Sequence, residues 1–281
     1  MNKNLFLIII TITTLLPLNT NGAKCHPDDE SGLLTLKSSI KFDPSSMLKT
    51  WITGTDCCTW SGVSCGDNKR VTTLSLTGDL ENPKSYLSGT VPKSFANLTK
   101  IFNLDLSDNF LVDPFPSLNV KGIESLDLSR NMFHLNEIPK WVTSSPIIYS
   151  LKLAKCGIKM KLDDWKPSET YFYDFIDLSG NEISGSAVGL LNETEYLVGF
   201  WSSENVLKFD LGSLRFGDRL KYLDLSHNMV FGKVTTSVVG IEKLNVSYNH
   251  LCGEIPKNNL SASVFVGNDC LCGSPLKPCK A

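Results

Sequence analysis

Apolar residues recur along most of the chain at a spacing that fits neither a helix nor a simple alternating strand. The stretch 101-IFNLDLSDNFL-111 has apolar residues at offsets 0, 3, 5 and 10 and an asparagine at offset 8. The same spacing returns 22 residues later in 123-IESLDLSRNMF-133. Residues at offsets 3 and 5 lie on the same side of a short strand. The pattern therefore predicts a short strand followed by a bend at the asparagine.

Eight units carry this spacing, and their starts are separated by 30, 22, 25, 25, 24, 23 and 21 residues. The units begin at Val71, Ile101, Ile123, Ile148, Tyr173, Leu197, Leu220 and Ile241. A period in the twenties with this spacing is the signature of leucine-rich repeats, whose turns bury a core only by stacking. The sequence thus predicts an α/β fold. We expect a right-handed solenoid of about eight repeats, with a parallel concave β-sheet and short helices or 3-10 turns on the convex side.

The asparagine at offset 8 is expected to stabilise the bend of each turn. Its amide can donate to and accept from buried backbone groups, so stacked turns would form a ladder. Cys156 occupies this position in one unit, as the general repeat pattern allows. We expect Cys156 to be buried and structural, with a reactive or partner-linked thiol as the alternative. The unit at Leu197 is weaker, because Ser202 stands where an apolar residue belongs.

The segments that flank the repeats have the composition of caps, which a solenoid needs to cover its apolar ends. Residues 28-DDESGLLTLKSSIKF-42 place Leu33, Leu36 and Ile40 on one face of a predicted helix. Eight cysteines gather at the two ends: Cys25, Cys57, Cys58, Cys65, Cys252, Cys270, Cys272 and Cys279. We assign residues 24–70 to an N-terminal cap, 71–251 to the repeats and 252–281 to a C-terminal cap.

Residues 1–23 have the features of a secretory signal peptide. Lys3 precedes an apolar run from Leu5 to Leu18, and the small residues Gly22 and Ala23 follow. The run is short for a membrane span, and an uncleaved anchor is the alternative. No other stretch approaches twenty apolar residues, so we expect no membrane span in the mature chain.

Secretion favours disulfides over zinc for both groups of four cysteines. The spacings also lack the two C-x2-C halves of a common zinc site. A bond between the adjacent Cys57 and Cys58 would be strained, which leaves two pairings in the N-terminal group.

Composition and charge narrow the function. The chain is 42% hydrophobic and 20% charged, with a formal net charge of −2, or −3 without Lys3. A weakly acidic protein is a poor candidate for binding nucleic acid. The four histidines occupy unrelated positions and no phosphate-loop motif occurs, so we expect neither a metal site nor a cofactor.

The outward residues at offsets 2 and 4 of each strand form the candidate binding face. Exposed aromatic residues on a rigid surface are candidates for binding hot spots. The residues that we expect to contact a partner are Asp105, Asp127, Phe175, Asp177, Trp201, Tyr222, Asp224 and His227. Two alternatives stay open: Trp201 could turn inward in the weak unit, and the aspartates could form only a solvated face.

Catalysis is not expected on this face. Asp105 and Asp127 would stand about 5 Å apart on adjacent strands, near the separation of a retaining glycosidase pair. That geometry follows from any strand ladder, and an open sheet does not exclude water. No metalloprotease or serine-hydrolase motif occurs. The sequence therefore predicts a binding protein rather than an enzyme.

Four N-x-S/T sequons predict glycosylation at Asn97, Asn192, Asn245 and Asn259. Asn97 and Asn192 fall between strands, and Asn259 lies in the C-terminal cap. A glycan on Asn245 would crowd the candidate binding face.

Several blocks of the sequence resemble plant extracellular leucine-rich-repeat proteins, above all the polygalacturonase-inhibiting proteins and their secreted relatives. These blocks are DCCTWSGVSC, LDLSDN, LDLSRN, LDLSHN, LNVSYNHLCGEIP and CLCGSPLKPC. The resemblance implies four disulfides: Cys25–Cys57, Cys58–Cys65, Cys252–Cys270 and Cys272–Cys279. It also implies second strands from an L-x-G-x-I/V-P pattern, which is intact in 87–92 and 251–256 but degraded in 111-LVDPFP-116. The family usually has about ten repeats, whereas this chain has eight.

The resemblance implies a secreted recognition protein of the plant cell wall or apoplast. Its concave face would inhibit a microbial polygalacturonase by occlusion. The alternative is a receptor-type module that binds a peptide or a plant receptor ectodomain in defence or developmental signalling. A degenerate relative without a ligand is a third reading. Direct contact with anionic pectin is less favoured, because basic residues are not grouped on the concave face.

Overall fold

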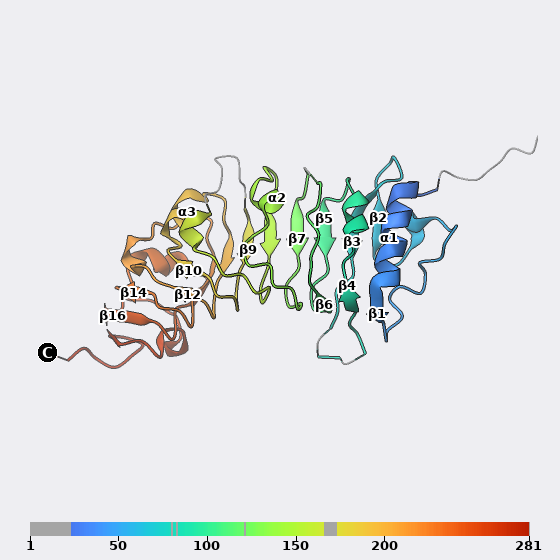
Figure 1. Ribbon diagram of the computed structural model, residues 1–281. Helices are drawn as coiled ribbons and strands as arrows, with labels where there is room; N and C mark the ends of the chain where they lie inside the picture. The colour runs from blue at the N-terminus through green and yellow to red at the C-terminus, as the bar shows by residue number, and fades with distance from the viewer. Residues whose placement is uncertain (1–23, 80, 83, 121, 166–172, 281) are drawn as a thin grey trace, which may run out of the picture.

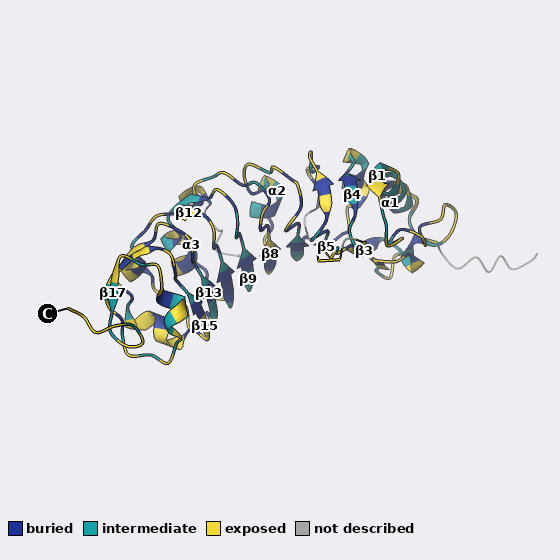
Figure 2. Cartoon of the chain, turned by 90° about the horizontal axis from the view of Figure 1, so that it is seen from below, coloured by how far each residue is buried: buried dark blue, intermediate teal, exposed yellow. Residues whose placement is uncertain are grey.

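The computed structural model describes residues 24–79, 81–82, 84–120, 122–165 and 173–280. The predicted signal peptide, residues 1–23, lies outside these ranges. The described chain forms an elongated stack of coils (Figure 1). Figure 2 shows that the stack follows an arc, with the strands of the long sheet on its inner side. The predicted leucine-rich-repeat solenoid is therefore confirmed.

One nine-stranded sheet lines the inner side of the arc, in the order β15-β13-β11-β9-β8-β7-β5-β3-β2. Its strands are β2 (Val63–Cys65), β3 (Val71–Ser75), β5 (Asn103–Asp105), β7 (Ser125–Asp127), β8 (Ser150–Lys152), β9 (Phe175–Asp177), β11 (Gly199–Trp201), β13 (Tyr222–Asp224) and β15 (Lys243–Asn245). Only β2 pairs antiparallel, with β3. Each predicted unit supplies one strand, and residues of equal offset lie opposite one another, as Leu74, Leu104 and Leu126 do.

Smaller sheets and short helices form the rest of each coil. The further strands are β1 (Ile40–Phe42), β4 (Ser88–Thr90), β6 (Phe110–Val112), β10 (Ser184–Gly185), β12 (Val206–Leu207), β14 (Phe231–Gly232), β16 (His250–Glu254) and β17 (Cys270–Cys272). They pair as β1-β4-β6, β10-β12 and β14-β16-β17. The outer helices and 3-10 turns are η2 (Lys93–Asn97), α2 (Lys140–Thr143), η3 (Leu162–Asp164), α3 (Val188–Glu193), η4 (Leu211–Ser213) and η5 (Thr236–Gly240). No helix in the described ranges is long and apolar enough to cross a membrane.

The core is one continuous column between the two sides of the coils. Leu104 and Leu106, at offsets 3 and 5, are 1% and 0% exposed. The weak unit tolerates Ser202 in the same column. Ser202 is fully buried, and the side-chain amide of Asn205 lies 3.3 Å from its hydroxyl. A local hydrogen bond thus replaces the missing apolar contact.

The asparagines form the expected ladder. The Asn131 amide donates to the Leu106 carbonyl of the preceding coil at 2.8 Å, and its oxygen accepts from the Leu111 N–H at 3.1 Å. The same scheme is repeated at Asn109, Asn181, Asn205, Asn228 and Asn249. Cys156 takes this position in its own coil, and its thiol donates to the Leu128 carbonyl at 3.3 Å. Burial raises the pKa of the Cys156 thiol, with a further contribution from nearby aspartate charges, so the thiol is structural.

The N-terminal cap packs a helix, α1 (Pro27–Ser39), against the first coils. The prediction that Ile40 lies on the helix is wrong. The helix ends at Ser39, and Ile40 has an extended backbone and begins β1, which pairs antiparallel with β4. Asp29 of α1 is fully buried, and its carboxylate accepts from the Arg70 guanidinium and from the Val71 N–H at 2.8 Å. This contact joins the helix to the first strand of the repeats. The cap also contains η1 (Cys57–Thr59).

The disulfides join Cys25 to Cys57, Cys58 to Cys65, Cys252 to Cys270 and Cys272 to Cys279. These are the pairs that the family resemblance implies. The coil pattern continues into the segment assigned to the C-terminal cap. Asn268 donates to the Val246 carbonyl and accepts from the Leu251 N–H, both at 3.0 Å. In this last coil the 3-10 helix η6 (Ala262–Phe265) takes the place of a concave strand.

Candidate binding face

The solvent-facing surface of the nine-stranded sheet lies on the inner side of the arc and is here called the concave face. It consists of two parallel rows of residues. The offset-2 row reads Thr73, Asn103, Ser125, Ser150, Phe175, Gly199, Tyr222 and Lys243. The offset-4 row reads Ser75, Asp105, Asp127, Lys152, Asp177, Trp201, Asp224 and Asn245. Both rows lie in register because parallel pairing aligns equal offsets on adjacent strands.

The aspartates of the offset-4 row serve the fold as well as the surface. Asp105 accepts from the Ser107 N–H at 2.9 Å and from the Ser107 hydroxyl at 2.6 Å. Asp224 makes the same pair of bonds to Ser226. Asp127 and Asp177 each accept from the backbone of the serine two residues later. One carboxylate oxygen of each aspartate therefore closes the bend that follows its strand.

Asp127 has the most perturbed environment in this row. Burial raises the pKa of its carboxyl group, and the charge of Asp105 on the next strand adds to the shift. Hydrogen bonds from Ser129 and the charge of Lys152 act in the opposite direction, with the Lys152 ammonium 3.5 Å from the carboxylate. Lys152 thus interrupts the line of negative charge and compensates part of it.

Three aromatic rings form a continuous stack on the C-terminal half of the concave face. The Trp201 ring lies 6.3 Å from the Phe175 ring and 5.9 Å from the Tyr222 ring, with interplanar angles of 27° and 16°. All three residues are partly exposed, so Trp201 does not turn inward. The Trp201 side chain starts in the offset-4 row but leans into the offset-2 row. A Cβ atom at Gly199 would lie only 2.3 Å from Trp201 Cη2. Glycine at position 199 therefore leaves the space that the indole occupies.

Charged groups border this stack. The Lys243 ammonium lies 5.7 Å from the centroid of the Tyr222 ring, in a cation–π arrangement. Asp177 and Asp224 flank Trp201 on the two neighbouring strands. Neither carboxylate belongs to an ion pair of the described residues. The face therefore offers aromatic rings beside two carboxylates that belong to no salt bridge of the described residues, although Lys152 stands opposite Asp177 on the adjacent strand.

His227 lies at the border of the concave face rather than in its rows. Its backbone has φ of 54°, and its exposed ring stacks on Tyr248 of the next coil at 4.3 Å. Tyr248 occupies the equivalent left-handed position, at offset 7. The two rings form a second stacked pair, and the Tyr248 ring also lies next to Gly267.

The predicted aspartate pair does lie on adjacent strands, with Asp105 opposite Asp127. Both side chains stand on an open sheet and are engaged with serines, which is a poor setting for general acid–base chemistry. In the described chain, three residues gather as potential metal ligands: Cys25, Cys57 and Cys58. All three belong to disulfides, so they offer no thiolate to a metal ion.

The four sequons differ in accessibility. Asn97, Asn192 and Asn259 are exposed. The Asn192 side chain accepts from the Arg215 N–H at 2.9 Å. Asn245 is partly buried in β15, and its oxygen accepts from the backbone and hydroxyl of Ser247. Its side chain therefore replaces the aspartate of other coils in closing a bend.

Sequence reasoning placed the aromatic residues together but missed how they stack. The tilt of Trp201 requires the glycine two residues before it, and this Gly-x-Trp spacing was the available signal. Lys243 and Tyr248 were also missed as neighbours of Tyr222 and His227. The offset-2 row already places Lys243 next to Tyr222, and extending the offset-7 row by one coil leads from His227 to Tyr248.

Comparisons with known proteins agree with this architecture. Residues 26–66 match the family model described as a leucine-rich-repeat N-terminal domain. Polygalacturonase inhibitor 2 of Arabidopsis thaliana is 31% identical, with an alignment that covers 100% of both chains. Leucine-rich repeat protein FLOR 1 of Arabidopsis thaliana is also 31% identical, over 98% of each chain. A crystal structure of a plant ice-binding protein has 26% identity and a TM-score of 0.65, and covers 92% of this chain and 99% of that one. On these similarities, the chain belongs to the family of plant leucine-rich-repeat proteins that includes the polygalacturonase inhibitors.

Proposed function

We propose that the protein is a secreted inhibitor of microbial polygalacturonases and acts by covering the partner's active site with its concave face. The aromatic stack of Phe175, Trp201 and Tyr222 is the observation that carries this proposal. Such rings on a rigid sheet are costly to leave exposed and suit the centre of an interface. The full-length similarity to polygalacturonase inhibitor 2 supports the choice of partner class.

Charge supports the same partner. Asp177 and Asp224 flank the stack and belong to no salt bridge of the described residues, so a basic partner surface would complement them. Binding of anionic pectin fits less well, because the two rows hold four aspartates and only Lys152 and Lys243 as basic residues. Inhibition by occlusion needs no chemistry from this protein, and we infer that it binds rather than catalyses.

The proposal includes the processing and location of the chain. We infer that residues 1–23 are removed near Gly22 or Ala23 and that the mature protein enters the cell wall or apoplast. The caps would span 24–70 and 252–281 around the repeats at 71–251. Glycans are expected on Asn97, Asn192 and Asn259. N-terminal sequencing and glycopeptide mass spectrometry of secreted protein test these points.

A titration of fungal polygalacturonases with the purified protein tests inhibition. Release of reducing ends from polygalacturonate should fall in a saturable way for at least one enzyme. Unchanged pectin cleavage across several fungal enzymes would contradict the proposal and would favour a relative without this ligand.

A receptor-type module is the second candidate, supported by 30% identity to receptor-like protein kinase BRI1-like 3 over 86% of this chain and 19% of that protein. In that case the concave face would bind a peptide or a receptor ectodomain. Affinity capture from plant membrane extracts, with wild-type protein and Trp201→Ala in parallel, separates the two. Specific recovery of an ectodomain by the wild type alone, without polygalacturonase inhibition, would favour the receptor role.

A further inference from the structure

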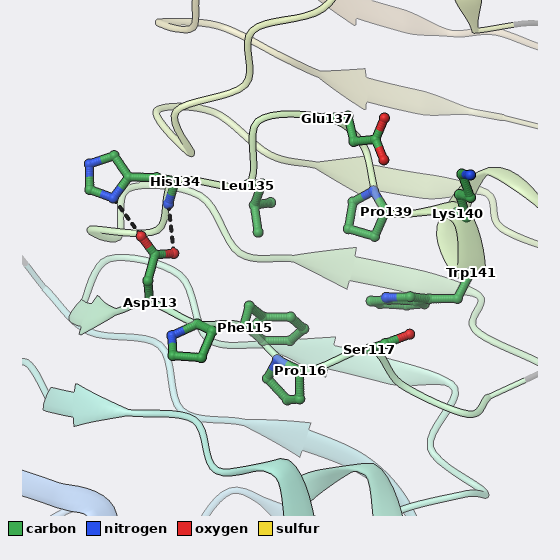
Figure 3. Close-up of a pocket in the computed structure, with 11 residues that line it drawn as sticks. Asp113, Phe115, Pro116, Ser117, His134, Leu135, Glu137, Pro139, Lys140 and Trp141 are labelled. Atoms are coloured by element: carbon green, nitrogen blue, oxygen red, sulfur yellow. Dashed lines mark hydrogen bonds and ion pairs between the residues drawn. The ribbon is translucent and has the colours of Figure 1, made fainter.

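The outer side of the coils has a hollow that the concave face does not explain. A cavity of about 350 Å³ lies between the segment after β6 and the start of α2 (Figure 3). Phe115, Pro116, Leu135, Pro139 and Trp141 form its apolar walls. A second hollow, of about 540 Å³, lies on the other side of residues 114–117. Both occur where 111-LVDPFP-116 departs from the repeat pattern.

Fixed contacts hold the walls of the first hollow in place. Asp113 accepts from the His134 N–H at 2.9 Å, and its other oxygen lies 2.6 Å from His134 Nδ1. Phe115 packs edge-on against Phe133 at 5.3 Å and lies 6.5 Å from the Trp141 ring. Because these contacts cross two coils, the hollow exists before any ligand arrives.

The hollow also presents unused polar groups. Figure 3 shows the indole nitrogen of Trp141 on the side of the ring that faces the hollow. This N–H has no hydrogen-bond partner among the described residues. Glu137 and Lys140, at the same end, belong to no ion pair of the described chain. A ligand could therefore accept one hydrogen bond from Trp141 and pair with a free carboxylate.

We propose that this hollow binds a proline-rich, extended segment of a partner protein. Aromatic and proline walls suit a prolyl ring, and a polyproline II segment loses little entropy because it is already extended. The carbonyl next to that proline would accept from Trp141 Nε1. The unpaired Glu137 carboxylate complements an arginine or lysine on one side of the proline, and the unpaired Lys140 ammonium complements an acidic residue or a terminal carboxylate on the other.

The second hollow extends the proposal to a second proline. It is lined by Val91, Pro92 and the far side of the 114–117 segment. A polyproline II helix advances about 3.1 Å per residue, so prolines two positions apart lie about 6 Å apart. Adjacent strands of the solenoid are about 4.8 Å apart, and coils spread further on the convex side of an arc. Two prolines that are two positions apart in one peptide match the spacing of two neighbouring coils. This site is independent of the concave face.

A peptide titration of the full mature protein tests the site. The probe is a fluorescent nonapeptide of eight prolines and one central arginine, and the control peptide replaces every proline with glycine or serine. We expect saturable binding of the proline peptide, with a Kd of about 10–500 μM, and a shift of the Trp141 indole N–H resonance in ¹⁵N-tryptophan-labelled protein. The control peptide should bind at least tenfold more weakly.

Variants assign the binding to the proposed groups. Trp141→Phe keeps an aromatic wall but removes the donor, so affinity should fall about fivefold or more. Phe231→Leu changes an exposed ring in β14 that lines neither hollow, so it is the control and should leave the Kd unchanged. Glu137→Gln changes an exposed side chain and should weaken binding about twofold while reducing its salt dependence. It also provides a second test if Trp141→Phe does not fold.

Three results would overturn the proposal. The first is equal binding of the two peptides, or no saturable binding at millimolar concentration. The second is an unchanged Kd in a folded Trp141→Phe variant or in Glu137→Gln. The third is a galacturonate oligosaccharide that shifts the Trp141 resonance when the proline peptide does not, which would assign the hollow to a saccharide.

Discussion

The two halves of the concave face share one scaffold but use it differently. In the N-terminal half, Asp105 and Asp127 are bound to the serines that follow their strands. In the C-terminal half, the rings of Phe175, Trp201 and Tyr222 stack on one another. The aspartates thus meet a need of the fold at each bend. The aromatic stack consists of rings that pack on one another and accept no hydrogen bond from a bend.

This difference separates structural from functional residues without any knowledge of the partner. The repeated aspartates are needed by the fold, because one oxygen of each carboxylate accepts a hydrogen bond at the bend after its strand. Binding to a partner is not required to account for them. A stack that needs Gly199 to make space is not explained by the coil. We therefore expect substitutions in the aromatic half to change binding, and substitutions in the acidic half to change stability.

The largest effect is expected for Trp201→Ala. This change removes the middle ring of the stack, and truncation of an aromatic hot spot costs about 2 kcal/mol or more, or about 30-fold in affinity. The inhibition constant against a sensitive polygalacturonase measures the loss. Unchanged inhibition by a folded Trp201→Ala protein would show that the stack lies outside the interface.

Asp105→Ala should have the opposite effect: it should lower stability and leave binding almost unchanged. It removes the acceptor of two hydrogen bonds from Ser107, which is buried, and should lower the free energy of unfolding by about 1–2 kcal/mol. Inhibition by the folded protein should change little. Urea unfolding measures the stability.

Asp105→Asn is the matched control for that change. An asparagine oxygen can accept the same bonds, as Asn245 does from Ser247. We expect this variant to recover most of the lost stability. Equal destabilisation by alanine and asparagine would refute the bend-closing role.

Gly199→Ala should weaken binding less than Trp201→Ala does. The new methyl group would meet the indole at 2.3 Å, so Trp201 must leave its place between Phe175 and Tyr222. We expect about a fivefold loss of inhibition and a change in tryptophan fluorescence, because interface side chains that lose their pre-organised position bind more weakly. Gly189→Ala, whose new methyl group would meet nothing within 4 Å, is the control and should leave both unchanged.

The smallest effect concerns the pH dependence of stability. Burial raises the pKa of Asp127, so the folded protein binds this proton more tightly than the unfolded chain does. The protonated Asp127 side chain makes its full contribution to stability below the ordinary carboxyl pKa of 3.8. This contribution is lost as the pH rises through the raised pKa of the folded protein. Asp127→Asn should flatten this decline above about pH 3.8, because an asparagine side chain does not titrate.

Thermal unfolding at several pH values tests the change. Asp177→Asn, at the same offset and with the same bond to the following serine, is the comparison variant. A decline that is unchanged in Asp127→Asn would contradict the assignment to this carboxyl group.

The fold could be predicted in detail because every coil must meet the same physical requirements. Every coil must bury two residues and satisfy the backbone at its bend, so offsets 3, 5 and 8 are constrained. The sequence therefore located the eight parallel strands of the concave sheet but not the antiparallel β2. The bend at Asn268 was not predicted, because Asn268 follows the 3-10 helix η6 instead of a strand.

The candidate site could be predicted only as a set of outward positions. The periodic pattern gave the rows, but a tilt such as that of Trp201 depends on a neighbouring glycine and on rings from two other coils. The outer hollow was visible only as a departure of 111-LVDPFP-116 from the pattern. Its shape depends on contacts of Asp113 with His134 and of Phe115 with Trp141, which join different coils.

Covalent footprinting of the complex with an inhibited polygalacturonase tests the central claim most directly. Oxidation of each tryptophan would be measured by mass spectrometry, with and without the partner. We predict that Trp201 becomes strongly protected while Trp141, on the outer side, remains as reactive as in the free protein. Protection of Trp141 with no change at Trp201 would contradict binding through the concave face.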